Sequence, residues 1–436
     1  MNLCGIIAEY NPMHLGHVYH IEETKKKTNC DGIVCILSGN FVQRGLPSIL
    51  DKWTRAKIAI ESGVDLVIEL PAVFAVSSAE HFAFGGVSLL NNLNVIDYIS
   101  FGSEEGNLLL IDKISDLLIN EPLEYKNLLK ESLNNGLSYP VARMEAIKTF
   151  LNLSSDEISI LNQSNNILSL EYLKAIKTLN SKIEPTTIKR LGAGYNSTEV
   201  SSSFPSASGV RAFLKDGGDI NTLNDKLPKS SILETNKNLD NLVFPSDMFP
   251  YIKYKLLTDS ESISRIYDVS EGIDNKILKE IINANSLEEL LANIKSKRYA
   301  YTRLSRILCK LFIGLENYDV QSIVKKPVEY ARILGLNSTG AEIIKEIKKK
   351  SDIEIITKFP RKYSNPSLEI DLLATKAYSM INKNIGPMDD YKRGPYVNSQ
   401  FTMRNSQLRW IFPCGENYFS LADGMWCQWI VRRNEY

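Results

Sequence analysis

Short apolar runs alternate with helix-like stretches along the first two hundred residues, and this alternation restricts the possible fold more than any other feature. Five runs are candidate buried strands: Leu3–Ala8, Gly32–Leu37, Val64–Leu70, Val95–Phe101 and Ile183–Ile188. Helical spacing marks four segments between them: Val18–Lys27, Asp51–Ser62, Ser78–Leu90 and Leu108–Phe150. Strands that alternate with helices form βαβ units and a parallel sheet, whose ligands bind at the carboxyl ends of the strands. We therefore predict an α/β fold with a parallel sheet.

A mainly helical C-terminal region is expected after this sheet. From about Leu227 the alternation stops, and Ile277–Leu315 and Val328–Lys350 carry apolar residues at helical spacing. We predict three segments, with the sheet in residues 1–220, the helices in 221–390 and a tail of uncertain role in 391–436. The tail holds three of the four tryptophans, and no lysine follows Lys392.

Composition restricts the class of protein. Lysine plus arginine (51) balances aspartate plus glutamate (51), so contact with a nucleic acid would have to rest on a local patch. No apolar run approaches the roughly 20 residues that cross a bilayer, and the N-terminal run lacks the basic leader of a secretory signal. The six cysteines contain no CxxC pair, which favours free thiols over disulfides or a zinc site. We expect a soluble cytoplasmic protein.

Three of the four histidines lie within seven residues, directly after the first candidate strand: His14, His17 and His20. This is the first βα turn of a Rossmann-like sheet, where phosphates bind at helix N-termini. Gly16 lets a nucleotide approach the backbone, and His14 and His17 can direct N–H donors at one phosphate, stabilising charge at a five-coordinate phosphorus. The alternative is a packed turn with surface histidines. No Cys, Asp or Glu at ligand spacing completes a metal site.

One later segment is strongly basic. Leu291–Lys310 contains no acid, and its basic side chains are Lys295, Lys297, Arg298, Arg303, Arg306 and Lys310. Tyr299 and Tyr301 lie among them. Such a segment can bind a phosphate backbone while its tyrosines stack on bases, and a solvated helix face is the alternative.

Several motifs resemble a known family. EYNPMHLGH resembles the HxGH signature of the nucleotidyltransferase superfamily, and other runs are similar to the bacterial tRNA(Met) cytidine acetate ligase family. These runs are SGNFVQRGLPSILDKWTRAKIAIESGVDLVIELP, FGSE, NNIL with EYLKAI, and TTIKR ahead of SASGVR. The resemblance implies a sheet of the HxGH nucleotidyltransferase type, followed by a helical tRNA-binding domain. It implies an enzyme that activates acetate with ATP to acetyl-adenylate and acetylates the exocyclic amine of the wobble cytidine of elongator tRNA(Met).

The resemblance also assigns ligand contacts. It places ATP, with Mg²⁺ offsetting the charge of the phosphates, on the run Ile7, Ala8, Glu9, Tyr10, Asn11, Pro12, Met13, His14, Leu15, Gly16, His17, Val18, Tyr19 and His20. Further nucleotide contacts are Gly102, Asn165 and Arg190, with the neighbouring Asn166 leaving the register of Asn165 open by one. Gly102 and Arg190 end strand candidates, so both are also expected at the ligand edge of the sheet.

The motif SASGVR resembles a second signature of the superfamily that binds the β- and γ-phosphates. Ser208 would cap a helix and donate to phosphate, and Arg211 would neutralise departing pyrophosphate. Gly209 departs from the usual pattern, in which a threonine or other side chain is common.

The loop SGNFVQRG after the second strand candidate offers polar side chains for acetate, cytosine or phosphate, namely Asn40, Gln43 and Arg44. An ordinary surface loop is the alternative. Lys52 and Arg55 on the next helix would add positive charge near the same edge.

The resemblance also requires a surface that binds tRNA. The basic segment is the expected tRNA surface, through Lys295, Lys297, Arg298, Arg303 and Arg306.

Two other functions compete with the ligase. One is an adenylyltransferase acting on a small phosphorylated metabolite, and the other is a nucleotide-sensing or RNA-binding protein without activity. The large helical region argues against the first, and the intact His14, Gly16 and His17 argue against the second. No lysine loop of the KMSKS type is present, which argues against an aminoacyl-tRNA synthetase. The resemblance implies neither a membrane nor an obligate protein partner.

Overall fold

The computed structural model describes residues 1–104, 108–137, 139–159, 161, 163–190, 206–296 and 299–398. Lys297, Arg298 and the tail beyond residue 398 lie outside the described residues, so the expectations for them rest on the sequence alone.

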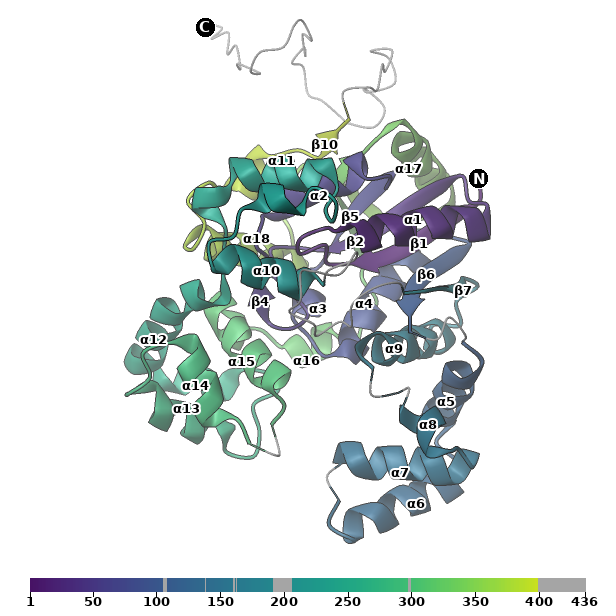
Figure 1. The fold of residues 1–436 in the computed structure, drawn as a ribbon, viewed down its shortest axis with the longest axis vertical. Coiled ribbons are helices and arrows are strands. Elements are labelled where there is room, and N and C mark those ends of the chain that lie inside the picture. Colours follow the sequence, from purple (N-terminus) through teal and green to yellow (C-terminus); the bar gives the residue numbers. More distant parts are fainter. Residues whose placement is uncertain are drawn as a thin grey trace, which may run out of the picture. The chain divides into compact units, whose positions relative to one another are not determined.

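The five expected strands are present and run parallel in one sheet (Figure 1). They are β1 (Leu3–Ala8), β2 (Gly32–Ser38), β5 (Leu66–Leu70), β6 (Tyr98–Ser103) and β7 (Glu184–Lys189). Their order is β5-β2-β1-β6-β7, and β1 pairs with β2 on one side and with β6 on the other. Their bounds differ from the predicted ones by a few residues. For example, β5 begins after Asp65, whose carboxylate accepts a hydrogen bond from Ile33 N at 2.8 Å.

Helices cover both faces of β1. The first is α1 (Leu15–Thr28), whose Thr24 hydroxyl lies 2.6 Å from that of Ser100 on β6. The other face packs against α4 (Ala79–Asn92) so closely that a Cβ at Gly5 would lie 2.6 Å from Leu90. Gly5 therefore belongs to the packing of the sheet.

Side-chain caps explain where two further helix starts fall. Asp51 precedes α2 (Lys52–Glu61) and accepts hydrogen bonds from the backbone of Trp53 at 3.0 Å and Thr54 at 3.1 Å. Ser78 caps α4 in the same way. Both helices agree with the sequence prediction because Asp and Ser satisfy N–H groups that a first helical turn leaves unpaired.

The sheet continues in the C-terminal part of the chain, although helices were expected through residue 390. The strand β8 (Tyr330–Leu336) runs antiparallel to β5, and β9 (Glu354–Ile356) and β10 (Tyr396–Val397) run parallel to β8. The helical prediction for Val328–Lys350 is therefore wrong for its first part and correct for α17 (Ser338–Lys350). All seven residues of β8 are buried, so the strand shows none of the alternation that marks a half-exposed strand.

Helices dominate the two remaining regions, as predicted. Leu108–Phe150 forms α5 (Leu109–Asn120), α6 (Leu123–Asn134) and α7 (Tyr139–Leu151). The second region contains α12 (Phe249–Thr258), α13 (Ile273–Ile281), α14 (Leu287–Ile294) and α15 (Tyr301–Ile313). Among the described residues, no helix is both long and apolar enough to span a membrane.

The other elements are short or connect these regions. The strands are β3 (Phe41–Val42) and β4 (Leu46–Pro47); the helices are α3 (Ala72–Ala75), α8 (Ser155–Ser159), α9 (Ser164–Thr178), α10 (Ala207–Lys215), α11 (Lys229–Lys237), α16 (Val320–Ile323), α18 (Pro366–Ser379) and α19 (Asp389–Lys392).

A buried group of charges joins the C-terminal strand to the parallel sheet. Lys52 lies 2.8 Å from Glu69 and 2.9 Å from Asp390, and Arg332 on β8 lies 3.2 Å from Glu69 and 2.6 Å from Asp390. Each of these side chains is at most 4% exposed. Buried charges of this kind persist only when each is paired, so these pairs fix Arg332 and Asp390 against α2 and β5. The assignment of catalysis to residues 1–220 and of tRNA binding to residues 221–390 stays a prediction.

Candidate active site

The site lies where the order of the strands reverses. From β1 the chain moves outward to β2 and β5, then returns to the opposite side of β1 with β6 and β7. At such a point the loops after neighbouring strands diverge and leave a crevice at the carboxyl ends. The HxGH turn follows β1, Gly102 lies near the end of β6, and Arg190 follows β7.

The turn between β1 and α1 holds the two signature histidines. Tyr10 adopts a left-handed backbone conformation (φ 43°), and the Asn11–Pro12 bond is cis. The Asn11 side chain accepts a hydrogen bond from Ile49 N at 2.8 Å, which ties the turn to the segment before α2. His14 then occupies the N-cap position of α1.

His14 and His17 stack on each other with 3.8 Å between ring centroids. Nδ1 of His14 accepts from Gly16 N at 3.1 Å, and Nδ1 of His17 accepts from His14 N at 3.2 Å. A neutral imidazole has one donor and one acceptor nitrogen, so both rings carry their proton on Nε2. The pair therefore offers two Nε2–H donors at the first turn of a helix, an arrangement suited to an anion.

These rings stay neutral near pH 7. Burial, followed by the charge of Arg190, lowers the pKa of His14 to about 3. Burial also lowers the pKa of His17 well below its ordinary value, and the nearby His14, Arg190 and His20 act in the same direction. Neutral rings also suit the stacked arrangement, because two imidazolium rings at this distance would repel each other.

His20 completes the cluster one turn later. Its Nε2 lies 3.0 Å from the hydroxyl of Ser100 on β6. Burial and Arg190 lower the pKa of His20 to about 4. His20 thus links α1 to the strand across the crevice.

Arg190 and Asn165 come together at the end of β7. Arg190 donates to Asn165 Oδ1 at 2.9 Å, and Asn165 donates to Glu104 at 2.6 Å. Asn166 is fully buried and accepts from Glu104 N at 3.4 Å. The geometry therefore pairs Asn165 with Arg190, in the register of the sequence prediction. A Cβ at Gly102 would lie 3.2 Å from Arg190 Cγ, so Gly102 leaves room for the stem of that arginine.

The motif SASGVR begins α10, but its capping residue differs from the prediction. Ser206, not Ser208, is the N-cap, and its hydroxyl accepts from Gly209 N at 2.9 Å. The prediction was wrong because either serine of the motif can precede a helix, and the sequence does not show which has extended backbone angles. Ser208 instead accepts from Arg211 at 3.2 Å, and Arg211 also donates to the carbonyl of Asn11 at 2.6 Å. Arg211 thus lies against the HxGH turn.

The loop after β2 forms the hairpin β3–β4. Gln43 lies in the connection, and its backbone N donates to Glu9 Oε1 at 2.8 Å. Asn40 is buried, accepts from Lys52 N at 2.9 Å and lies 3.5 Å from the Thr375 hydroxyl. The structure thus brings Gln43 and Arg44 near the end of β1, whereas Asn40 points into the fold.

Lys52 and Arg55, expected to add positive charge near this edge, are both buried, and the Arg55 guanidinium reaches the edge. Lys52 is 1% exposed and lies in the buried charge group. Arg55 is also 1% exposed, and it donates to the carbonyl of Glu9 at 2.6 Å and to those of Ser38 and Gly39. The sequence shows a basic residue on this helix but not whether its side chain is buried against backbone carbonyls. For that reason the sequence analysis missed this contact. Arg55 holds the ends of β1 and β2 together.

Helix α11, which the sequence analysis did not connect with the site, supports the HxGH turn from outside. Ser231 donates to the carbonyl of Met13 at 2.8 Å, and Leu15 N donates to Lys226 O at 2.9 Å. No sequence signal joins these positions, because the contacts span more than two hundred residues.

The basic segment is only partly open to solvent. Lys295 is exposed, whereas Arg303 donates to the Asp268 carbonyl at 2.9 Å and Lys310 pairs with the Asp268 carboxylate at 2.5 Å. Lys310 is fully buried, so it belongs to the core. Tyr299 is also buried, at 6% exposure, while Tyr301 is 45% exposed. Arg306 packs beside the hairpin, where a Cβ at Gly45 would strike its backbone.

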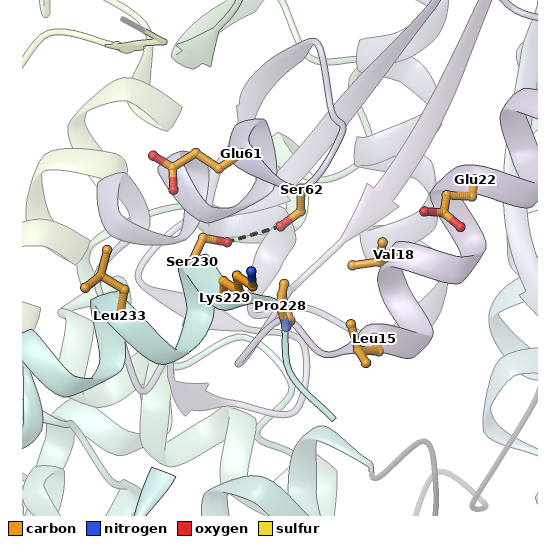
Figure 2. A pocket seen from close by; sticks show the side chains of 9 residues that line it. All are labelled: Leu15, Val18, Glu22, Glu61, Ser62, Pro228, Lys229, Ser230 and Leu233. Atoms are coloured by element: carbon orange, nitrogen blue, oxygen red, sulfur yellow. Dashed lines mark hydrogen bonds between the residues drawn. The ribbon is translucent and has the colours of Figure 1, made fainter. Parts of the chain in front are cut away.

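A separate groove of about 750 Å³ lies beside α1 (Figure 2). Its walls come from α1, α2 and the start of α11, and they consist of Leu15, Val18, Glu22, Glu61, Ser62, Pro228, Lys229, Ser230 and Leu233. Figure 2 shows Ser62 and Ser230 facing each other, with their hydroxyls 3.3 Å apart. The groove lacks the paired N–H donors of the histidine turn, so we place the chemistry at the histidines. Within the described ranges, no group of three or more His, Cys, Asp or Glu side chains is placed to hold a metal ion.

A fold and a histidine turn of this kind define a class of protein. A sequence model of the family described as HIGH Nucleotidyl Transferase matches residues 1–392. The chain therefore belongs to the HIGH nucleotidyltransferase family, which confirms the fold class predicted from the HxGH motif.

Relatives narrow the class. The chain is 52% identical over 397 residues to the tRNA(Met) cytidine acetate ligase of Clostridium novyi (strain NT), covering 91% of this chain and 99% of the relative. It is 49% identical over 399 residues to the protein of the same name from Clostridium acetobutylicum, covering 90% and 99%. It also resembles the crystal structure of Thermotoga maritima TmcAL bound with alpha-thio ATP, with a TM-score of 0.83 and 29% identity over 91% of this chain and 99% of that one. Within the HIGH family, the chain thus belongs to the tRNA(Met) cytidine acetate ligases.

Proposed function

We propose that this chain is a tRNA(Met) cytidine acetate ligase that uses ATP. The stacked His14–His17 pair carries the assignment of the reaction class, because two neutral N–H donors at a helix start suit the charge of a reacting phosphate. The substrates follow from the relatives, whose shared name specifies acetate and a cytidine of tRNA(Met). Binding of alpha-thio ATP by the Thermotoga protein supports ATP as the activating nucleotide.

In the first step, an acetate oxygen attacks the α-phosphorus of ATP and pyrophosphate leaves, which gives acetyl-adenylate. The Nε2–H groups of His14 and His17 donate to the oxygens that gain charge in the five-coordinate transition state. Arg190 and Arg211 border the crevice from opposite sides, at the end of β7 and on α10, and they balance the charge of the phosphates. Gln43 and Arg44 are our candidates for holding acetate, with Asn40 shaping their loop.

We expect Mg²⁺ to enter with the nucleotide. Mg²⁺ is commonly held by substrate phosphates together with one or two carboxylates and water, and the part of the chain that the structure describes offers no larger ligand cluster. The ion would offset phosphate charge.

In the second step, the exocyclic amine of the wobble cytidine of elongator tRNA(Met) attacks the acetyl carbon, and AMP leaves. Catalysis is mainly positioning and electrostatics, as in other phosphoryl and acyl transfers.

We propose that the tRNA is held by the segment between α14 and the start of α15, where Lys295 and Tyr301 are exposed and Lys297, Arg298, Arg303 and Arg306 add charge. We propose that the enzyme works in the cytoplasm, where tRNA is found, and without an obligate protein partner. An adenylyltransferase of small metabolites or an inactive sensor is not favoured, because the relatives are named as ligases.

The assignment of His17 is tested by exchange of labelled pyrophosphate into ATP in the presence of acetate. We expect His17→Ala to lower the exchange rate by about 10²–10³-fold, the usual cost of removing one donor to a transition-state oxyanion. His81→Ala is the control, because His81 lies on α4 and bonds to Ser78 in the same helix cap. An unchanged exchange rate in folded His17→Ala would contradict the proposed role.

A further inference from the structure

Glu9 is a carboxylate at the ligand edge of the sheet that the steps above do not use. It is the first residue after β1 and precedes the HxGH turn, so it lies beside the position of the reacting phosphate. Glu9 as a residue is half-buried. The resemblance counts it among the ATP contacts, but a carboxylate does not attract phosphates, so we look for its task in the second step.

Two contacts hold Glu9 rigidly. Its Oε1 accepts from Gln43 N at 2.8 Å, and its carbonyl accepts from Arg55 at 2.6 Å. Within the described part of the chain, no hydrogen bond joins Oε2 to the protein. One oxygen is therefore fixed by the protein and the other is available to a ligand.

The charges around Glu9 come from three elements. Arg44 in the hairpin, Arg55 on α2 and Arg211 on α10 face it, and all three favour its ionised form. Removal from solvent acts more strongly in the opposite direction and raises the pKa of Glu9 above its ordinary value. A carboxylate of raised pKa is a better proton acceptor than a free one.

The hairpin that holds Glu9 also touches the helix assigned to the tRNA. Ser305 on α15 donates to the carbonyl of Gly45 at 3.0 Å, and Gly45 packs against Arg306. The hairpin therefore joins the carboxylate to the region that we propose holds the tRNA. Cytosine presents an amine donor at N4, for which Glu is a matching acceptor.

We propose that Glu9 accepts a hydrogen bond from the exocyclic amine of the acceptor cytosine and takes up its proton during acetyl transfer. The proposal rests on the function proposed above. The nitrogen lone pair forms the bond to the acetyl carbon, the bond from that carbon to the phosphate oxygen breaks, and its electron pair leaves with AMP. The proton released from nitrogen passes to Glu9 Oε2. Uracil has no such amine, so the same contact selects cytosine.

The test separates the two steps with Glu9→Gln. Glutamine keeps an oxygen for Gln43 N, so the hairpin stays anchored, but it cannot take up a proton. We expect single-turnover transfer from preformed acetyl-adenylate to tRNA to fall by about 10²–10⁴-fold, and acetate-dependent pyrophosphate exchange, which is complete before any amine reacts, to fall by much less. In the wild type, transfer should also decline as pH falls through the pKa of Glu9, and Glu9→Gln should lose this decline. Glu342→Gln, at an exposed position on α17, is the control.

Each other outcome overturns the inference. Equal losses of exchange and transfer would place Glu9 in nucleotide binding or in the fold, and unchanged transfer would show that it has no part in the second step. Absence of acetate-dependent exchange in the wild type would instead overturn the proposed function itself.

Discussion

His14, His17 and His20 differ from surface histidines in one physical respect: each is held as a neutral ring. The two signature rings have their Nδ1 atoms occupied by backbone N–H groups of their own turn, which fixes the tautomer without help from another part of the fold. The sequence was sufficient to select these residues, because a rare residue type repeats at helical spacing directly after a strand. It could not show that the rings stack, since stacking depends on backbone angles of the turn.

His20 gives the protein a pH-dependent stability. Its pKa of about 4 in the fold lies below the unfolded value of about 6.5, so the unfolded chain binds a proton that the native state excludes. Its contribution is complete above pH 6.5 and is lost as the pH falls towards 4. We would measure the free energy of unfolding in urea at pH 7.5 and at pH 5.0. The difference between these two values should be smaller in His20→Gln than in the wild type by about 2 kcal/mol. An identical pH dependence in wild type and variant would refute this.

At the scale of elements, the sequence predicted features that depend on neighbouring residues, such as helix starts. It did not predict contacts between residues that lie far apart in the chain. Asp51 and Ser78 marked the starts of α2 and α4 because an N-cap acts within three residues. The contact of the β3–β4 hairpin with α15 spans about 260 residues, through the bond of Ser305 to Gly45. No pattern in one sequence joins such positions, so the support that α15 and α11 give to the site could not be foreseen.

The segment between α14 and α15, which we propose as the tRNA surface, can be tested by reversing one exposed charge. Lys295 is exposed at the end of α14, so Lys295→Glu changes the surface charge without removing a buried ion pair. We expect the dissociation constant for tRNA to rise several-fold and the dependence of log K on log salt to lose about one unit of slope. Acetate-dependent pyrophosphate exchange should not change.

Lys349→Glu, on the exposed face of α17, provides the matched charge reversal. If both variants bind tRNA as tightly as the wild type, Lys295 belongs to a solvated face, the alternative that the sequence left open.

Across the whole molecule, the sheet is shared between distant parts of the chain. The parallel strands were predictable because each apolar run is followed by a helix. Strand β8 was not, because its burial on both faces removes the alternation, and its partners Glu69 and Asp390 lie far from Arg332 in sequence. Burial of these charges next to β8 does not leave any of them unpaired, because Lys52 and Arg332 each contact both Glu69 and Asp390. The loop after β2, which carries Gln43 and Arg44, begins beside this group.

The most direct test of the central claim is mass analysis of nucleosides from tRNA(Met) incubated with the protein, ATP and isotopically labelled acetate. The account predicts that the label appears on one cytidine, at the wobble position, with AMP and pyrophosphate formed in equal amounts. No label on cytidine, or label that appears without ATP, would contradict it.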